Sequence, residues 1–323
     1  MANTIKSYSE SFPLASEFSI SRGTKTHAHV VRVEVSDGKY TGNGECMPYA
    51  RYGESVEGVR ELIASLPQNV TRKELQEIMP AGAGRNAVDC ALWDLEAKQT
   101  GVPVWQLAGL AEPKEVTTAF TLSLDTPEAM EANARENAHR PLLKLKLGTP
   151  NDIPRLVAVR NGAPNSKIMV DANEGWEVST LKELQPALDA VGVELIEQPL
   201  PEADDTALIK SNIRIPLCAD ESCHTSQGLA DLKAKYNVLN IKLDKTGGLT
   251  EALHMKRLAE KMDFQIFVGC MVATSLAMAP AVLLAQGASY VDLDGPLLLA
   301  EDRPNALRYE GSTIYPPTSE LWG

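Results

Sequence analysis

The sequence predicts an α/β fold in which a closed barrel of parallel strands follows an α+β unit. From about Glu115 onwards, short apolar runs alternate with stretches long enough for one helix, which is typical of parallel strands joined by crossover helices. Eight such runs occur, and eight strands suffice to close a barrel. The segment before them instead carries a hairpin pattern and then helical patterns, which indicates a unit of mixed α+β structure.

The N-terminal unit begins with extended chain. In HAHVVRVEVSDGKYTGNGEC, Val31, Val33 and Val35 alternate with polar residues before the turn SDGKY and a second extended run, which predicts a β-hairpin. Apolar residues then recur at helical spacing in GESVEGVRELIASL, RKELQEIMP and NAVDCALWDLEAKQTG. We expect the last of these helices to end at Gly101, because glycine readily terminates helices.

The expected barrel strands share a regular spacing. They are TTAFTLSL, LLKLKL, KIMVDAN, VELIEQP, IPLCADES, VLNIKLD, FQIFVGC and YVDLDG. One residue near the end of each run recurs at intervals of 22 to 27 residues, and these residues are Thr121, Lys146, Asp171, Glu197, Asp220, Lys242, Gly269 and Asp292. Because the C-terminal ends of barrel strands form one face, we expect these residues to converge on a single mouth.

Composition excludes several classes of partner. With a net charge of −12, the chain repels phosphate backbones and anionic lipid, so neither nucleic acid nor membrane is expected as a partner. The start of the chain has no apolar core of signal-peptide length, and no apolar run is long enough to span a bilayer. The five cysteines are scattered without metal-type spacing, which favours reduced thiols and a cytoplasmic enzyme. A homo-oligomer is compatible with the sequence.

Three acidic residues at consecutive strand ends indicate a metal site. Asp171, Glu197 and Asp220 would repel one another unless a cation lay between them. An all-oxygen site favours a hard ion such as Mg²⁺ over zinc, so we expect one Mg²⁺ per subunit. The alternative is that each acidic residue caps the helix that follows its strand.

Lysines flank this triad on both sides. Lys144 and Lys146 lie on one face of a strand, and Lys242 ends the strand beyond the acidic residues. A neighbouring cation disfavours the ammonium form, so Lys144 and a metal would both help Lys146 to act as a base. Bases on opposite sides of a substrate carboxylate held by Mg²⁺ would make a racemase or epimerase. Alternatively, Lys144 and Lys146 are a solvated pair on an edge strand.

Two further features indicate the substrate. Asp292 and Asp294 lie two apart in YVDLDG and would attract a substrate ammonium group, although LDG also reads as a simple turn. Arg22, in the glycine-containing loop SISRGTKTHA, could cover the mouth and bind an anionic side chain, although most loop arginines are only solvated. Cys270 and His224 have no evident partner for nucleophilic catalysis, and we interpret both as packing or supporting groups.

The motifs KLK, VDAN, IEQP, ADES and NIKLDKTGG, in this order and spacing, resemble the enolase superfamily, specifically its muconate-lactonising branch. The resemblance covers nearly the whole chain. It implies a (β/α)₇β modified TIM barrel of residues 115–299 and an α+β N-terminal capping domain of residues 1–114, completed by residues 300–323. The segments DLDG, SRG, PYARYGES and CADESCHT are similar to the dipeptide epimerases of that branch.

The resemblance also implies roles for single residues. Lys146 and Lys242 would be the two bases, and the three strand-end carboxylates would hold Mg²⁺. The reaction implied is epimerisation of the C-terminal residue of L-Ala-D/L-Glu, a cell-wall peptide fragment. The residues implied to bind the dipeptide are Arg22, Thr121, Lys144, Asp292 and Asp294, and those implied to support the metal ligands are Asn173 and Glu221.

Other functions remain open at this point. A dipeptide epimerase of different specificity would use the same residues. Muconate cycloisomerisation, o-succinylbenzoate synthesis and N-acylamino acid racemisation act on substrates without a free ammonium group, so Asp292 and Asp294 disfavour them. A barrel that binds an acidic ligand without catalysis is the alternative from another class, and the presence of all the lysines disfavours it.

Overall fold

The computed structural model describes residues 3–149 and 152–323, and its N-terminal part is built on an antiparallel sheet. Strands β1 (Thr4–Ile20), β2 (Gly23–Ser36) and β3 (Thr41–Cys46) pair in that order. The predicted hairpin is confirmed as β2 and β3, with Val31 opposite Cys46 and Ser36 opposite Thr41. The sequence analysis missed β1, whose alternation is blurred because many of its side chains are polar and exposed.

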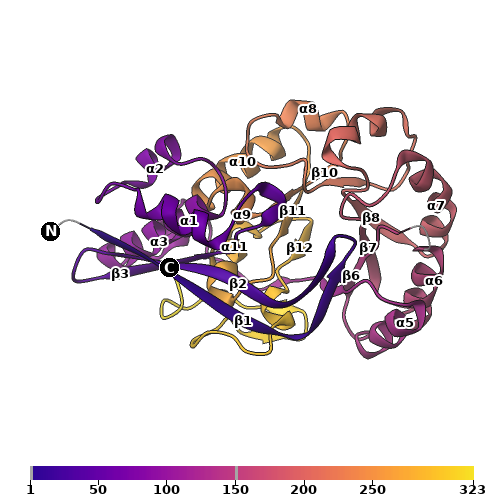
Figure 1. Ribbon diagram of the computed structural model, residues 1–323, viewed down its shortest axis with the longest axis horizontal. Coiled ribbons are helices and arrows are strands. Elements are labelled where there is room, and N and C mark those ends of the chain that lie inside the picture. The colour runs from indigo at the N-terminus through magenta and orange to yellow at the C-terminus, as the bar shows by residue number, and fades with distance from the viewer. Residues whose placement is uncertain (1–2, 150–151) are drawn as a thin grey trace.

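The hairpin of β1 and β2 extends beyond the cap and runs along the barrel (Figure 1). Its two strands pair from Thr4 opposite Ser36 to Ile20 opposite Gly23, with a change of register between Pro13 and Phe18. Residues 21 and 22 form the tip. The hairpin therefore carries Arg22 far from the cap sheet, to a place where it contacts residues of the barrel.

Three helices follow the sheet, as expected: α1 (Val56–Ala64), α2 (Arg72–Ile78) and α3 (Ala83–Thr100). Helix α3 ends as predicted at Gly101, whose φ of 69° is in the left-handed region. The helix contacts β3 on one side and two barrel helices, α9 (Leu243–Thr246) and α10 (Leu249–Lys261), on the other. Hydrogen bonds from Asn86 to Asp244 and from Trp93 to Thr250 cross the second contact. Helix α3 therefore joins the cap to the barrel.

The eight predicted barrel strands are all present and form one sheet in chain order. They are β5 (Phe120–Leu122), β6 (Leu142–Lys146), β7 (Lys167–Asp171), β8 (Val193–Glu197), β9 (Leu217–Ala219), β10 (Val238–Ile241), β11 (Gln265–Gly269) and β12 (Tyr290–Asp292). Neighbouring strands are parallel. A backbone hydrogen bond from Ala119 N to Val291 O, 2.8 Å long, joins the two ends of the sheet and closes the barrel.

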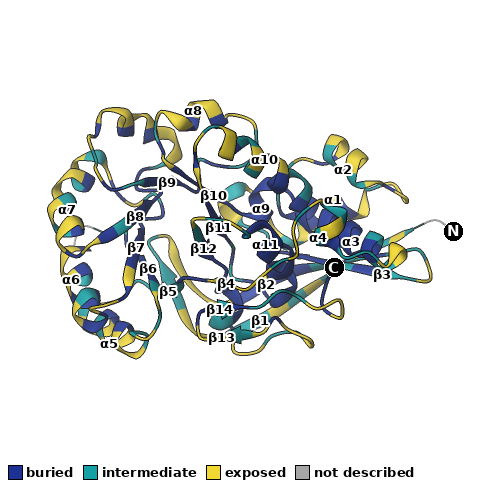
Figure 2. Ribbon diagram, turned by 180° about the vertical axis from the view of Figure 1, so that it is seen from behind, coloured by how far each residue is buried: buried dark blue, intermediate teal, exposed yellow. Residues whose placement is uncertain are grey.

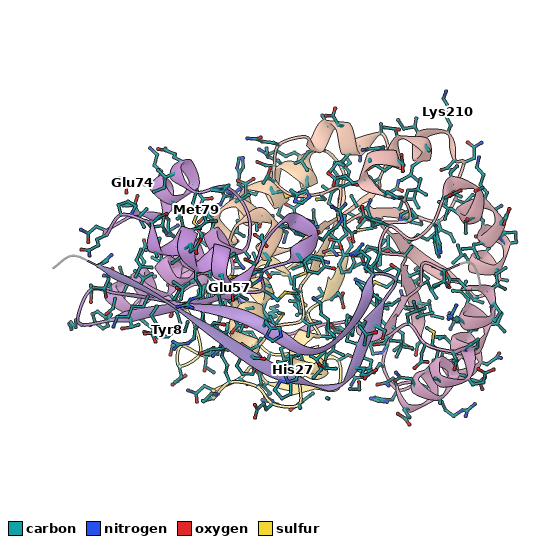
Figure 3. All side chains as sticks on the ribbon, viewed as in Figure 1. Tyr8, His27, Glu57, Glu74, Met79 and Lys210 are labelled. Atoms are coloured by element: carbon teal, nitrogen blue, oxygen red, sulfur yellow. The ribbon has the colours of Figure 1, made fainter. Side chains whose placement is uncertain are left out.

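The strands are connected through helices that surround the barrel. Besides α9 and α10 these are α5 (Pro127–Glu136), α6 (Asp152–Gly162), α7 (Val178–Ala190), η2 (Glu202–Lys210), α8 (Leu229–Lys233) and α11 (Ser275–Leu284). The β8–β9 connection, η2, is a 3₁₀ helix, and its last residue, Lys210, points outward from the rim (Figure 3). The outer faces of the helices are exposed while the strands are buried (Figure 2).

Shorter elements complete the chain. They are η1 (Ala50–Tyr52), α4 (Val104–Leu107), β4 (Val116–Thr117), η3 (Gly295–Leu298), β13 (Tyr309–Glu310) and β14 (Thr313–Ile314). Strand β14 pairs with both β13 and β4. Farther along, Trp322 donates a hydrogen bond to the Cys90 carbonyl of α3, so the end of the chain packs against the cap.

Within the described residues, no helix is long and apolar enough to cross a membrane. All five cysteines are unpaired.

The barrel interior is apolar at the bottom and charged at the top. Met169, Leu195 and Phe267 belong to a fully buried cluster contributed by several barrel strands. Leu143, Leu145 and Leu147 belong instead to the large core that includes the surrounding helices. The alternation of side chains along β6 therefore turns its lysines inward, and because β6 lies between β5 and β7 it is not an edge strand.

The packing of β3 against α3 predicts a strong effect of one methyl group. A Cβ added at Gly44 would lie 2.0 Å from the Ala87 carbonyl oxygen, so Gly44→Ala must push the strand and helix apart. We expect a loss of about 1–3 kcal/mol in unfolding free energy, measured by urea denaturation. The control is Gly58→Ala in α1, where the nearest atom is the Ser55 hydroxyl at 3.2 Å and the effect should stay within about 1 kcal/mol. Equal stability of the two variants would contradict this packing.

Candidate active site

Five adjacent strands bring charged side chains together at the mouth of the barrel. In spatial order, β6 to β10 carry at or directly after their C-terminal ends Lys146, Asp171, Glu197, Asp220 and Lys242. One carboxylate oxygen of each acidic residue lies within 4.8 Å of the others. The convergence expected from the regular spacing is therefore observed, with the acidic residues in the centre and one lysine on each side.

The two outer lysines are paired with the acidic residues. Lys146 Nζ lies 2.6 Å from Asp171 Oδ2, and Lys242 Nζ lies 2.7 Å from Asp220 Oδ2. Burial by itself would lower the pKa of Lys242, but the charges of Asp220 and Glu197 hold it well above its usual range. The neighbouring carboxylates therefore favour the ammonium form of Lys242.

Lys144 occupies the middle of the cluster. Its side chain is 1% exposed, and its ammonium group lies 2.7 Å from Glu197 Oε2, 2.9 Å from Asp292 Oδ2 and 3.2 Å from Asp171 Oδ2. Burial opposes the charge of Lys144, but these carboxylates raise its pKa well above the usual range. Lys144 and Lys146 contact the same oxygen of Asp171. The negative charge of this carboxylate offsets the repulsion expected between two ammonium groups on one face of a strand.

The three central carboxylates do not titrate alike. Burial would raise the pKa of Asp171 and Asp220, but the lysine charges hold both below their usual range. For Glu197, burial and the charge of Asp171 raise the pKa to about 8. Among the three carboxylates, Glu197 is therefore the one for which the protonated form is favoured.

Unpaired oxygens also gather at this site. In the described part of the chain, four buried side-chain oxygens of this region have neither a hydrogen-bond donor nor an ion-pair partner: Asn173 Oδ1, Glu221 Oε2, Asn240 Oδ1 and Asp292 Oδ1. Buried oxygens normally have a partner, so this concentration suits a bound cation or a hydrogen-bond donor of a ligand. The donor set suits Mg²⁺, because it is composed of oxygen and includes three convergent carboxylates.

Several supporting residues were not singled out from the sequence. Lys245 is buried, and its ammonium group donates to the Asp220 carbonyl oxygen and to Asp220 Oδ1, each at 2.5 Å. Asn240 donates to Glu197 Oε1 at 2.7 Å, and Gln198 accepts a hydrogen bond from the Asp220 backbone N–H at 2.9 Å. All three residues lie inside the motifs IEQP and NIKLDKTGG. Their place in these motifs is the sequence signal that could have identified them as parts of the site.

The last strand contributes two more carboxylates. Asp292 ends β12 and contacts Lys144, while one of its oxygens is buried without a donor. Asp294 lies just before η3 and accepts a hydrogen bond of 2.7 Å from the Thr121 backbone N–H. Burial and the charge of Asp292 raise the pKa of Asp294 to about 7. Asp294 thus serves in the turn, and its carboxylate also adds to the acidic lining of the site.

Arg22 reaches the mouth from the hairpin tip. Its guanidinium donates to the Asn173 carbonyl at 2.8 Å, to Glu221 Oε1 at 2.7 Å and to the Tyr49 hydroxyl at 3.2 Å. The neighbouring negative charge of Glu221 outweighs burial and raises the pKa of Arg22. The backbone N–H of Asn173 donates to Asp171 Oδ1 at 2.9 Å, so Asn173 connects Arg22 to the carboxylate triad.

Cys270 and His224 have surroundings that suit packing. Burial raises the thiol pKa of Cys270, so the thiolate needed for nucleophilic attack is disfavoured. The His224 ring lies edge-on to Tyr52, with 5.0 Å between centroids, and burial lowers its pKa. Neither residue has a partner arrangement that suggests covalent catalysis.

Comparison with known proteins agrees with this architecture. The chain matches the family model described as mandelate racemase/muconate lactonizing enzyme, N-terminal domain, over residues 2–109. It matches the model described as enolase C-terminal domain-like over residues 128–320.

Two curated relatives cover almost the whole chain. The N-acetyl-D-glutamate racemase of Pseudoalteromonas sp. is 48% identical over 300 residues, which are 91% of this chain and 95% of the relative. The L-Ala-D/L-Glu epimerase of Escherichia coli (strain K12) is 45% identical over 318 residues, which are 97% of this chain and 99% of the relative.

Solved structures agree as well. An enolase family member from Agrobacterium tumefaciens with homology to dipeptide epimerases, solved with sodium and L-Ala-L-Glu, is 51% identical with a TM-score of 0.95, covering 99% of this chain and 100% of its own. A dipeptide epimerase from Cytophaga hutchinsonii, solved with Mg and D-Ala-L-Val, is 29% identical with a TM-score of 0.91, covering 98% and 94%. This chain therefore belongs to the mandelate racemase/muconate lactonizing enzyme family of the enolase superfamily.

Proposed function

We propose that this protein is a dipeptide epimerase that moves a proton at the α-carbon of the C-terminal residue of L-Ala-D/L-Glu in the presence of Mg²⁺. The observation that carries the proposal is the spatial order of the strand ends, in which Lys146 and Lys242 stand on opposite sides of three convergent carboxylates. The similarity to the epimerase of Escherichia coli over 97% of the chain supports the same conclusion.

Asp171, Glu197 and Asp220 would hold the metal ion. Asn173 and Glu221 would support these ligands, since Asn173 donates to Asp171 and Glu221 follows Asp220 directly. A bound Mg²⁺ supplies positive charge that competes with the lysines for these carboxylates and stabilises the negative charge that develops on a substrate carboxylate.

Lys146 and Lys242 would transfer the proton. Their ammonium nitrogens contact the two outer carboxylates of the triad, so a substrate α-carbon over the centre of the triad would have one lysine on each side. The neutral amine of one lysine would take the α-proton, and the ammonium group of the other would deliver a proton to the opposite face. Reversing the two roles would run the reaction from the other isomer, which explains why two lysines are needed.

Other charged residues would bind the rest of the dipeptide. The acidic lining formed by Asp292 and Asp294 suits the α-ammonium group of the N-terminal residue, and the unpaired oxygen of Asp292 is available to accept from it. Lys144 would balance the negative charge of the carboxylates. Thr121 would lie beside the dipeptide backbone, because the bond from its own N–H to Asp294 places it next to the acidic lining. Arg22 at the hairpin tip would meet the acidic side chain of glutamate.

Racemisation of an N-acylated glutamate is the second candidate, because a racemase of N-acetyl-D-glutamate is 48% identical. Both substrates present a glutamate α-carbon, and they differ in the free ammonium group of the dipeptide. The buried unpaired oxygen of Asp292 favours the dipeptide, because an N-acetyl methyl group cannot donate a hydrogen bond to it.

The proposed setting is degradation of cell-wall peptides in the cytoplasm, which the five unpaired cysteines and the dipeptide chemistry support. We also propose that residues 1–114 and 300–323 form the capping domain and residues 115–299 the barrel. The hydrogen bond between Trp322 and Cys90 supports assignment of the C-terminal segment to the cap.

Mg²⁺ should stabilise the folded protein. A ligand at about 100 times its dissociation constant adds about 2.7 kcal/mol, so the thermal midpoint should rise with Mg²⁺ concentration. In Asp220→Asn this rise should disappear, whereas it should persist in Asp94→Asn, which alters a buried, ion-paired carboxylate of the cap. The readout is differential scanning calorimetry with and without Mg²⁺. An undiminished rise in Asp220→Asn would contradict the proposed ligand set.

Each outer lysine should be essential for epimerisation. Removing Lys146 or Lys242 leaves one face of the α-carbon without a proton carrier, so Lys146→Ala and Lys242→Ala should abolish interconversion of the isomers. In D₂O, each variant should still exchange the α-proton of one isomer, and the two variants should exchange opposite isomers. Lys235→Ala is the control, because Lys235 is ion-paired with Asp205 outside the triad. Full epimerase activity in either active-site variant would rule out the two-base scheme.

The carboxylate of Asp292 should separate the two candidate substrates. In Asp292→Asn, the oxygen opposite the ammonium group loses its charge, so kcat/KM for L-Ala-D-Glu should fall by about 100-fold relative to that for N-acetyl-D-glutamate. Comparing the two substrates on the same variant cancels any general damage from the lost contact with Lys144. An unchanged ratio would show that Asp292 does not recognise the ammonium group.

A further inference from the structure

One carboxylate of the barrel joins two separate segments of the cap. Glu174 follows β7, and its side chain is only 9% exposed. Arg51 of η1 binds it with two hydrogen bonds, of 2.9 Å to Oε2 and 2.8 Å to Oε1. Arg22 of the hairpin tip adds a third, of 3.2 Å to Oε2. We call this contact of Glu174 with Arg22 and Arg51 the cap latch.

The backbone around Glu174 is unusual for residues that carry a side chain. Asn173 and Glu174 have φ values of 45° and 66°, which lie in the left-handed region. Glu174 N–H donates to the Gln198 carbonyl at 2.9 Å, which anchors the turn to the end of β8. Disfavoured conformations of this kind persist where surrounding contacts hold them, and here they direct the carboxylate of Glu174 towards the cap.

The segment held by Arg51 also borders the proposed active site. Tyr52, in the same turn of η1, packs edge-on against His224, which lies four residues beyond Asp220. Burial and the charge of Asp220 raise the pKa of the Tyr52 hydroxyl, which is consistent with a position beside the carboxylate triad. Tyr49 packs against Tyr52, with 5.5 Å between centroids, and accepts a hydrogen bond from Arg22.

The two arginines depend on Glu174 to different degrees. Arg22 also donates to Glu221 and to the Asn173 carbonyl, at 2.7 and 2.8 Å, so it keeps strong partners without Glu174. Among the described residues, the other acidic side chain paired with Arg51 is Glu202, at 3.8 Å, and that side chain is 47% exposed. Loss of Glu174 would therefore release η1 more than the hairpin tip.

We propose that Glu174 is a positioning residue that holds η1 and the hairpin tip over the mouth of the barrel. Through Arg51 it fixes the turn that carries Tyr52, and through Arg22 it orients the guanidinium that faces the substrate side chain. Glu174 thereby sets the affinity for the dipeptide without taking part in proton transfer. The kinetic consequence rests on the proposed function, whereas the structural consequence does not.

Steady-state kinetics test the role in affinity. Glu174→Gln removes the charge but keeps the shape, so KM for L-Ala-D-Glu should rise about tenfold while kcat changes by less than about twofold. Arg51→Gln should have the same effect, and the double variant should be no worse than either single variant, because all three lose the same pair. Glu202→Gln is the control, since its long contact with Arg51 should leave KM unchanged. A fall in kcat at constant KM in Glu174→Gln would overturn the proposal.

Hydrogen exchange tests the latch without any substrate. In Glu174→Gln, amide exchange should become faster in residues 49–53 and, to a smaller extent, in residues 20–25, while the rest of the cap sheet should be unaffected. Unchanged exchange in residues 49–53 would overturn the latch whatever the kinetic result. Failure of the wild-type protein to act on L-Ala-D-Glu would instead count against the proposed function, and the exchange measurement would still decide the latch.

Discussion

Charge compensation inside the barrel mouth is the constraint on which the rest of the structure depends. Asp171, Glu197 and Asp220 are each buried, and buried carboxylates in contact are unfavourable unless cations accompany them. Here the ammonium groups of the neighbouring lysines provide that charge, and Glu197 still has a raised pKa because burial and the charge of Asp171 outweigh it. The site is therefore organised for a further cation, which under the proposed function would compete with the lysines for the carboxylates.

The fold satisfies this constraint in three layers. An apolar cluster that includes Met169 and Phe267 fills the lower barrel, and Lys144 Nζ lies 5.3 Å from the centre of the Phe267 ring, directly above it. Parallel strands β6 to β10 then deliver one charged residue each to the same level, at or directly after their C-terminal ends. The cap covers that level through Arg22 and Arg51, so the charges are kept from water, where electrostatic interactions would be weaker.

The sequence predicted the parts of this arrangement that repeat. The barrel strands and the positions of Lys146, Asp171 and Glu197 follow from a spacing of one strand and one crossover, which needs no knowledge of distant contacts. Strand β1 was missed because its polar residues hide the alternation, and Glu174 was missed because the two arginines that bind it lie more than 100 residues away. Hydrogen bonds between distant segments leave no periodic trace in a single sequence, so only the structure identified the partners of Arg22.

The most direct measurement is proton NMR of L-Ala-D-Glu with the protein and Mg²⁺ in D₂O, following the glutamate α-proton. This account predicts that the α-proton signal disappears while L-Ala-L-Glu forms, and that the alanine α-proton stays intact, because only the residue with the free carboxylate lies between the two lysines. Persistence of the glutamate α-proton in both isomers, with the folded protein and Mg²⁺ present, would contradict the proposed chemistry.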